Sequence, residues 1–145
     1  MKPSEAIKQK IKTFEGLCLV ATRCSAGVPT IGYGHTGPEV RMGQRISKEK
    51  ADEIFTKDID AFSEGVAKLL PMGISQCRFD ALVSFAFNCG LGALQRSTLL
   101  KKVKANPADP SIRTEFMRWV NAGGKKLAGL VKRRSMEADH YFGLS

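Results

Sequence analysis

Residues 14–36 decide the fold, and they read FEGLCLVATRCSAGVPTIGYGHT. Before this stretch, apolar residues recur at helical spacing over 4–14, which predicts a short amphipathic helix. Gly16 then supplies a residue that commonly ends helices. After it, glycines and a proline separate β-prone pieces at 17–21 and 30–33, which predicts a small hairpin with glycine-rich turns.

The rest of the chain has a helical pattern. Apolar residues at helical spacing predict one long helix over 47–70, and the most hydrophobic segment, 75–90, predicts a core helix. Shorter helices are expected over 97–105, 111–122 and 128–141. So long a helix in a small chain suggests a strut between two lobes.

Length and composition indicate one compact domain. The chain has 145 residues, of which 43% are hydrophobic and 26% charged, which excludes disordered, collagen-like and membrane classes. Its net charge is 23 − 14 = +9, and the part from Arg96 onward carries 11 − 4 = +7. This charge indicates either a solvated basic face or a surface for a polyanion such as nucleic acid, anionic lipid or an acidic cell-wall polymer. The N-terminus has no apolar signal region, so neither a signal peptide nor a membrane anchor is expected.

The four cysteines do not form a metal-binding pattern. Cys18, Cys24, Cys77 and Cys89 lack C-x-x-C spacing, and the chain has only two histidines, so no metal site and no cofactor are expected. Cys77 and Cys89 fall in the apolar helical stretch and are predicted to be reduced core residues. Cys18 and Cys24 could form a disulfide only if the hairpin brings their Cα atoms within ~7 Å, and two free thiols are the alternative.

Glu15 is the candidate for acid chemistry. It ends the first helix, where the helix dipole disfavours a negative charge, and Phe14 and the glycine-rich turn could partly desolvate it. A carboxylic acid that stays protonated near neutral pH can protonate a glycosidic oxygen. The alternative is an ordinary surface glutamate in the last turn of a helix.

The segments 14–17, 27–36, 76–90, 96–100 and 116–134, in this order, resemble the bacteriophage lysozymes, endolysins of glycoside hydrolase family 24. The likeness extends over nearly the whole chain. It implies an α+β, mostly helical, lysozyme-like fold in which a long helix joins a small β-hairpin lobe to a helical lobe.

On this resemblance, we expect a single lysozyme-like domain over 1–145. The hairpin lobe would span about 15–46 and the connecting helix about 47–70. The helical lobe would comprise about 71–145 together with the N-terminal helix 4–14.

The resemblance also implies a catalytic constellation of Glu15, Cys24 and Thr30, whose spacings of nine and six residues match the family. Glu15 would be the general acid at the bond between N-acetylmuramic acid and N-acetylglucosamine, and Thr30 would orient the attacking water. The middle position is commonly Asp in the family. A thiol there could position water, act as a base, or attack the sugar as a thiolate.

Four further residues match places along the family's cleft and are candidate saccharide contacts: Thr36, Phe87, Asn88 and Thr98. For Phe87, core packing is the alternative. His35 is expected to make a structural hydrogen bond or ion pair, with no role as a base or metal ligand.

The function that the resemblance implies is that of an endolysin, a muramidase that hydrolyses bacterial peptidoglycan and acts as a monomer without a cofactor. Neither a nucleic-acid partner nor stable membrane insertion is expected. Without an export signal, the protein would accumulate in the host cytoplasm and reach the wall with the help of a separate membrane-permeabilising protein, a holin. Two alternatives stay open: a lytic transglycosylase that uses Glu15, and an inactive cationic module that binds the wall or disrupts membranes.

Overall fold

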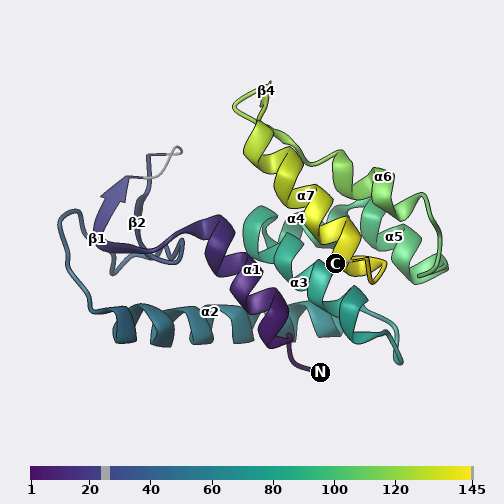
Figure 1. Cartoon of the computed structure of the whole chain (residues 1–145), viewed down its shortest axis with the longest axis horizontal. Helices are drawn as coiled ribbons and strands as arrows, with labels where there is room; N and C mark the ends of the chain where they lie inside the picture. Colours follow the sequence, from purple (N-terminus) through teal and green to yellow (C-terminus); the bar gives the residue numbers. More distant parts are fainter. Residues whose placement is uncertain (24–26, 145) are drawn as a thin grey trace. The chain divides into compact units, whose positions relative to one another are not determined.

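The chain forms two compact units in the computed structural model, which describes residues 1–23 and 27–144 (Figure 1). We call Lys8–Ala61 the hairpin unit. The helical unit combines Met1–Ile7 with Phe62–Ser145, so its two parts are separated in sequence by the whole hairpin unit.

The two longest predicted helical segments of the first half are confirmed as α1 (Glu5–Glu15) and α2 (Lys48–Leu69). Each begins after a serine: the Oγ atoms of Ser4 and Ser47 accept hydrogen bonds from the N–H three residues on, at 3.2 and 3.0 Å. Such bonds satisfy amide groups that the first turn of a helix leaves without a partner. Both boundaries between the units fall inside these helices.

The predicted hairpin is confirmed as β1 (Cys18–Arg23) paired antiparallel with β2 (Pro29–Gly32). The register places Thr22 opposite Thr30, and a register shift lies between Cys18 and Thr22. The side chains of cross-strand partners lie on the same face of a sheet. The hairpin therefore sets two threonines side by side.

A small apolar core supports this hairpin. Ala21, Ile31 and Val40 are buried together, and Ile46 packs against them. Ala21 also joins the segment that follows the hairpin, because its N–H donates to the carbonyl of Gln44 at 2.8 Å.

Helix α3 (Gln76–Cys89) is the centre of the helical unit (Figure 1). All residues from 79 to 86 are buried, as expected for a helix that is covered on every side. Helices α4 (Leu91–Arg96) and α7 (Ala128–Tyr141) pack against it. The predicted core helix is thus confirmed.

Helices α5 (Thr98–Ala105) and α6 (Ile112–Met117) complete the unit. Aromatic side chains fill the space between α3 and the α6 region. The ring of Phe85 makes edge-on contacts with the rings of Phe116 and Trp119, with centroids 6.0 and 5.2 Å apart. This geometry is the favoured one for aromatic pairs.

The prediction of a single helix over 111–122 was wrong, because α6 ends earlier and a second hairpin follows. Strand β3 (Asn121–Ala122) pairs antiparallel with β4 (Lys125–Lys126). Gly123 and Gly124, between them, have φ values of +59° and +78°. Two consecutive residues with positive φ form a tight hairpin turn that glycine adopts without strain.

The prediction that Cys77 is a core residue was also wrong. Cys77 is exposed, since it lies in the first turn of α3, before the buried run begins, whereas Cys89 is half-buried. Cys18, Cys77 and Cys89 carry free thiols. Cys24 lies outside the described residues.

Part of the positive charge that follows Arg96 lies inside the helical unit. Arg133 and Arg134 are only 4% and 0% exposed, and both pair with buried Glu137, at 3.6 and 3.0 Å. The solvated basic face is therefore smaller than the sequence count of charges indicates. Its exposed members are Arg96, Lys101, Lys104, Arg118, Lys125, Lys126 and Lys132.

Asp80 connects three segments of the helical unit. Its carboxylate is 1% exposed and accepts hydrogen bonds from the N–H and Oγ of Ser4, at 3.0 and 2.5 Å. It also lies 2.7 Å from the donating Nε2 of Gln76 and 2.9 Å from the Nε2 of His140. Burial raises the pKa of Asp80, but the hydrogen bonds from His140, Ser4 and Gln76 outweigh burial and leave the pKa below its usual value.

Candidate functional site

Glu15 is the last residue of α1, at the point where the chain turns into the hairpin. Gly16 follows with a φ of +73°, and its N–H donates to the carbonyl of Lys12 at 2.9 Å, which ends the helix. Glu15 is half-buried. The helix end thus holds a carboxyl group partly out of solvent.

A hollow of about 300 Å³ in the hairpin unit contains this carboxyl group. It brings together Glu15 and Thr30, two of the three residues expected to be catalytic. The third, Cys24, lies outside the described residues. The residues that line the hollow are Glu15, Gly16, Leu17, Cys18, Thr22, Thr30, Gly32 and Gly34.

Thr30 presents a hydrogen-bond acceptor to this hollow. It is half-buried, and its Oγ1 donates to the carbonyl oxygen of Val28 at 3.0 Å. A hydroxyl whose proton is used in this way still has an oxygen lone pair that can accept a hydrogen bond. The Oγ1 atom of Thr30 can therefore accept a hydrogen bond from a water molecule.

Cys18 and Thr22 also line the hollow, and neither was expected at the site from the sequence. The Sγ of Cys18 donates to the carbonyl of Val20 at 2.8 Å and lies 3.6 Å from the Oγ1 of Thr22. The pairing of Thr22 with Thr30 depends on the register of the hairpin. The position of Thr22 follows once the register is known, but the register could not be predicted from the sequence.

Gly34 packs directly against the catalytic candidate. A Cβ atom added at this position would overlap the Oε1 atom of Glu15, and the residue has a φ of +77°. The backbone therefore approaches the carboxylate more closely than any other amino acid would permit, and it restricts where that carboxylate can lie.

His35 makes the ion pair that was expected of it. Its Nδ1 lies 2.7 Å from the Oδ2 of Asp58 and its Nε2 lies 2.6 Å from the Oε1 of Glu39. Partial burial lowers the pKa of His35, but the hydrogen bonds with these two carboxylates, together with their charges, raise it above its usual value overall. Lys50 and Lys57 line the same hollow of the hairpin unit, which measures about 270 Å³.

This ion pair predicts a pH-dependent stability. The pKa of His35 is raised on folding. Its contribution to the free energy of unfolding is therefore fully present below the pKa of the unfolded chain, near 6.5, and is lost as the pH rises through the pKa of the folded protein. We expect His35→Asn to destabilise the protein by about 1 kcal/mol at pH 5.5, after allowance for solvent screening, and by less at pH 8. Urea denaturation of both proteins at the two pH values measures this difference, and an equal loss at both would contradict the assignment.

The comparison with known families decides the identity of the fold. The family model described as phage lysozyme matches residues 12–137. The chain belongs to the phage lysozyme family. The resemblance noted from the motifs and the α+β, mostly helical, lysozyme-like fold are thereby confirmed.

Individual phage lysozyme relatives agree. The chain is 46% identical over 142 residues to the endolysin of Bacillus phage B103, which covers 94% of this chain and 52% of that protein. The chain thus spans about half the length of this curated relative. The endolysin from Escherichia coli O157:H7 phage FAHEc1 has a TM-score of 0.86 and 38% identity, covering 97% of this chain and 93% of that one. The muramidase domain of SpmX from Asticaccaulis excentricus has a TM-score of 0.85 and 34% identity, covering 97% of each.

The other candidate residues of this phage lysozyme family member lie in different settings. Thr36 is exposed in the hairpin unit and does not line the hollow around Glu15. In the helical unit, Phe87 is half-buried and its ring centroid lies 5.3 Å from that of Phe62, so packing accounts for much of its surface. Asn88 and Thr98 are exposed, at the end of α3 and the start of α5.

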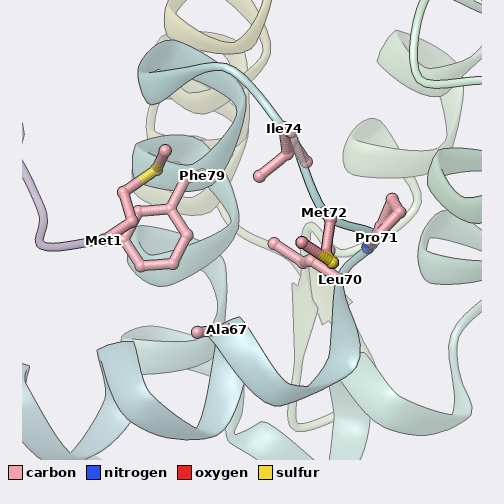
Figure 2. A pocket seen from close by; sticks show the side chains of 8 residues that line it. Met1, Ala67, Leu70, Pro71, Met72, Ile74 and Phe79 are labelled. Carbon is pink, nitrogen blue, oxygen red and sulfur yellow. The ribbon is translucent and has the colours of Figure 1, made fainter.

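A further hollow of about 180 Å³ lies in the helical unit, where the chain passes from α2 to α3 (Figure 2). Its lining provides no titratable side chain, so it offers nothing for acid–base chemistry. The lining residues are Met1, Ala67, Leu70, Pro71, Met72, Gly73, Ile74 and Phe79.

Neither a cluster of possible metal ligands nor a membrane-spanning helix is found in the described part of the chain. Within residues 1–23 and 27–144, no group of three or more His, Cys, Asp or Glu side chains is placed to hold a metal ion. The helices of the same residues all lack the length and apolar character needed to cross a bilayer.

Proposed function

We propose that this phage lysozyme family member is an endolysin that hydrolyses the β-1,4 bond between N-acetylmuramic acid and N-acetylglucosamine in bacterial peptidoglycan. The observation that carries the proposal is the hollow in which Glu15 and Thr30 both line the surface. Glu15 supplies a proton donor, and Thr30 supplies a hydroxyl group that can hold water. The relatives named endolysin and muramidase add support.

In the proposed reaction, protonated Glu15 gives its proton to the glycosidic oxygen as the bond from that oxygen to the muramic acid C1 breaks. A water molecule attacks C1 and releases a proton to the surrounding water, from which the Glu15 carboxylate is protonated again, so the products are two sugar chains with a new hydroxyl on each side of the broken bond. The close approach of Gly34 restricts the Glu15 carboxyl to one region of the hollow. A proton donor that is already held in place lowers the entropy cost of reaching the reactive geometry.

Thr30 would orient the attacking water. Because its hydroxyl proton is used in the hydrogen bond to the Val28 carbonyl, the Thr30 oxygen can accept a hydrogen bond from that water, which directs a water lone pair toward the sugar carbon. In this role Thr30 moves no proton of its own. It lowers the entropy cost of placing the nucleophile.

Cleavage of purified peptidoglycan, followed by mass analysis of the fragments, tests this proposal. Hydrolysis yields fragments with a reducing N-acetylmuramic acid end. A lytic transglycosylase would yield anhydro ends that are lighter by one water. Intact glycan strands, with lysis of cells nonetheless, would identify a cationic membrane-disrupting module.

We expect Cys24→Ser to reduce the rate of lysis only partly, by about tenfold or less. A thiol is mostly neutral at pH 7 and is a weaker base than a carboxylate, so a role in positioning water could be taken over by a hydroxyl. Turbidity loss of a cell-wall suspension measures the rate. A loss as complete as that caused by removing Glu15 would instead identify the thiol as an essential base or nucleophile.

Gly34→Ala should lower the rate of lysis by about 10- to 100-fold, because the new Cβ must displace the Glu15 carboxylate. Its positive φ should also cost about 1–2 kcal/mol of stability. Gly43→Ala is the matched control, since Gly43 has a φ of +80° and nothing within 4 Å of an added Cβ. Both variants should lose similar stability in thermal denaturation, and only Gly34→Ala should lose activity. Equal rates in the two variants would contradict this account of the site.

The proposal extends to how the protein reaches its substrate. It would act as a monomer on the wall, gain access through a holin and remain in the host cytoplasm until lysis, as the family resemblance implies. Exposed basic side chains, such as those of Lys125 and Lys126, would attract the anionic wall. Added salt would weaken that attraction.

A further inference from the structure

We propose that Thr22 holds the attacking water together with Thr30, each threonine accepting one of the two hydrogens of that water. Thr22 lies on β1, lines the same hollow as Glu15 and Thr30, and is exposed to solvent. The inference rests on the proposed function, in which Thr30 orients a water for attack on the sugar. It adds a second hydroxyl group to that task.

The register of the hairpin places the two threonines at a suitable separation. Thr22 and Thr30 are direct partners in the antiparallel pair, and the Cβ atoms of such partners lie about 4.5–5.5 Å apart on one face of the sheet. Two oxygens that accept both hydrogens of one water also lie about 4.5 Å apart, because each O···O distance is about 2.8 Å. A single water between the two side chains matches this spacing.

A contact with Cys18 determines how the Thr22 hydroxyl is oriented. The Sγ of Cys18 uses its one proton in the hydrogen bond to the Val20 carbonyl, at 2.8 Å, so it can only accept from the Oγ1 of Thr22, 3.6 Å away. Thr22 therefore donates to the sulfur, and the lone pairs of its oxygen are left to accept. Thr30 is in the same state, since its Oγ1 donates to the Val28 carbonyl.

A bend in β1 makes this contact possible. Residues four apart on a straight strand are separated by about 13 Å, whereas the side chains of Cys18 and Thr22 are in contact. The register shift between these two residues marks the place where the strand departs from a straight course. The irregularity thus brings a sulfur acceptor to a hydroxyl group that lines the hollow.

Two acceptors determine the orientation of a water molecule more completely than one. A water that donates to Thr30 alone can still rotate about that hydrogen bond. When both of its hydrogens are bound, its lone pairs face away from the two threonines and into the hollow, where the sugar carbon would lie. Neither threonine removes a proton, so the proton that the water loses still passes to the surrounding water.

Thr22→Val removes the hydroxyl group and keeps the branched shape of the side chain. We expect kcat for peptidoglycan hydrolysis to fall about tenfold while KM stays within about twofold, because the order of the nucleophile affects the reaction and not the binding of the glycan. Thr22→Ser, which keeps a hydroxyl group, should retain kcat within about threefold of the native value. A native kcat in Thr22→Val would overturn the proposal.

Thr56→Val is the matched control in the hairpin unit. Thr56 is exposed on α2, does not line the hollow, and donates from its Oγ1 to the Asp52 carbonyl at 2.9 Å. The same loss of a hydroxyl group should leave kcat unaltered there. Thermal denaturation of Thr22→Val should match that of the native protein, since valine and threonine both favour strands. An equal decrease of kcat in Thr22→Val and in the control would overturn the proposal.

A double substitution tests whether the two threonines hold the same water. Thr30→Val should lower kcat about tenfold or more, and adding Thr22→Val should lower it by only about twofold further, because a water that has already lost one partner has little order left to lose. Losses that multiply independently would overturn the proposal.

Competition between water and methanol gives a readout that a merely structural role would not change. Methanol has one O–H hydrogen, so its methyl group would face one of the two threonine oxygens, and the native site should disfavour it. In Thr22→Val the methyl group meets an apolar neighbour, and the ratio of methyl glycoside to free reducing end should rise about fivefold at the same methanol concentration. Mass analysis separates the two products, which differ by one CH₂ group. An unchanged ratio would overturn the proposal.

The same measurements separate the role of Thr22 from the proposed function. A native protein that releases neither reducing ends nor methyl glycosides from peptidoglycan would contradict the proposed function itself. A native protein that hydrolyses the glycan, with kcat and the methanol ratio unaltered in Thr22→Val, would contradict only the role of Thr22.

Discussion

Glu15→Gln is expected to reduce peptidoglycan hydrolysis about a thousand-fold. Glutamine has nearly the same shape but no acidic proton, so the leaving oxygen would depart without protonation. The hollow around Glu15 offers no second carboxyl group among its lining residues, so no neighbour can take over the role. The release of reducing ends from purified walls measures the effect directly.

Glu64→Gln provides the control for this experiment. Glu64 is exposed on α2, so the same chemical change there should leave hydrolysis unaltered. Equal thermal stability of Glu15→Gln and the native protein would show that the loss is chemical. Full hydrolysis by Glu15→Gln would refute the assignment of the general acid, and continued lysis of cells without hydrolysis would favour a membrane-disrupting activity.

Asp80→Ala should have the largest effect on stability, about 3–5 kcal/mol. It leaves the buried donors of Ser4, Gln76 and His140 without their shared acceptor. Thermal denaturation should show a decrease in Tm of about 10 °C or more. The pKa of Asp80 is lowered on folding. Its contribution to the free energy of unfolding is therefore present above the pKa of the unfolded chain, near 3.8, and is lost as the pH falls through the pKa of the folded protein.

The control for Asp80 is an exposed ion pair of the same unit. Asp139 lies 2.8 Å from Arg113, and its side chain is 45% exposed. Asp139→Ala should therefore cost about 1 kcal/mol or less. Comparable losses in the two variants would mean that the burial of Asp80 is not what makes its network important.

Most of the helices could be predicted to within a few residues because their signals are local. The last helix was expected over 128–141, and α7 has these bounds. Ser4 precedes the first helix and caps it, and the apolar spacing from there onward follows one face. Such patterns depend on neighbours in sequence and need no information about tertiary contacts.

The second hairpin and the buried charges could not be predicted in the same way. Gly123 and Gly124 allow a tight turn, but whether two residues on each side pair as strands depends on the surrounding helices. Arg133 and Arg134 carry charges of the kind that usually lie in solvent. They can be buried because Glu137 lies next to them on α7 and pairs with both. A partner for a buried charge is a property of the fold, not of the local pattern.

The candidate site was predicted in part for a similar reason. Glu15 and Thr30 were assigned by their spacing, and they line one hollow. Cys18 and Thr22 were missed because their place in that hollow follows from the register of β1 and β2. Register depends on the turn and on the apolar side chains behind the sheet, which the alternation within a single strand does not determine.

The Asp80 network has a consequence for the order of events during synthesis. Ser4 lies 76 residues before Asp80, separated from it by the whole hairpin unit, and His140 lies 60 residues after Asp80. A ribosome makes the chain from its N-terminus, so the first seven residues are exposed long before α7 emerges. We therefore expect the Asp80 network to be completed only once α7 has emerged from the ribosome. A chain truncated before α7 would lack His140 and leave Asp80 without one of its hydrogen-bond partners.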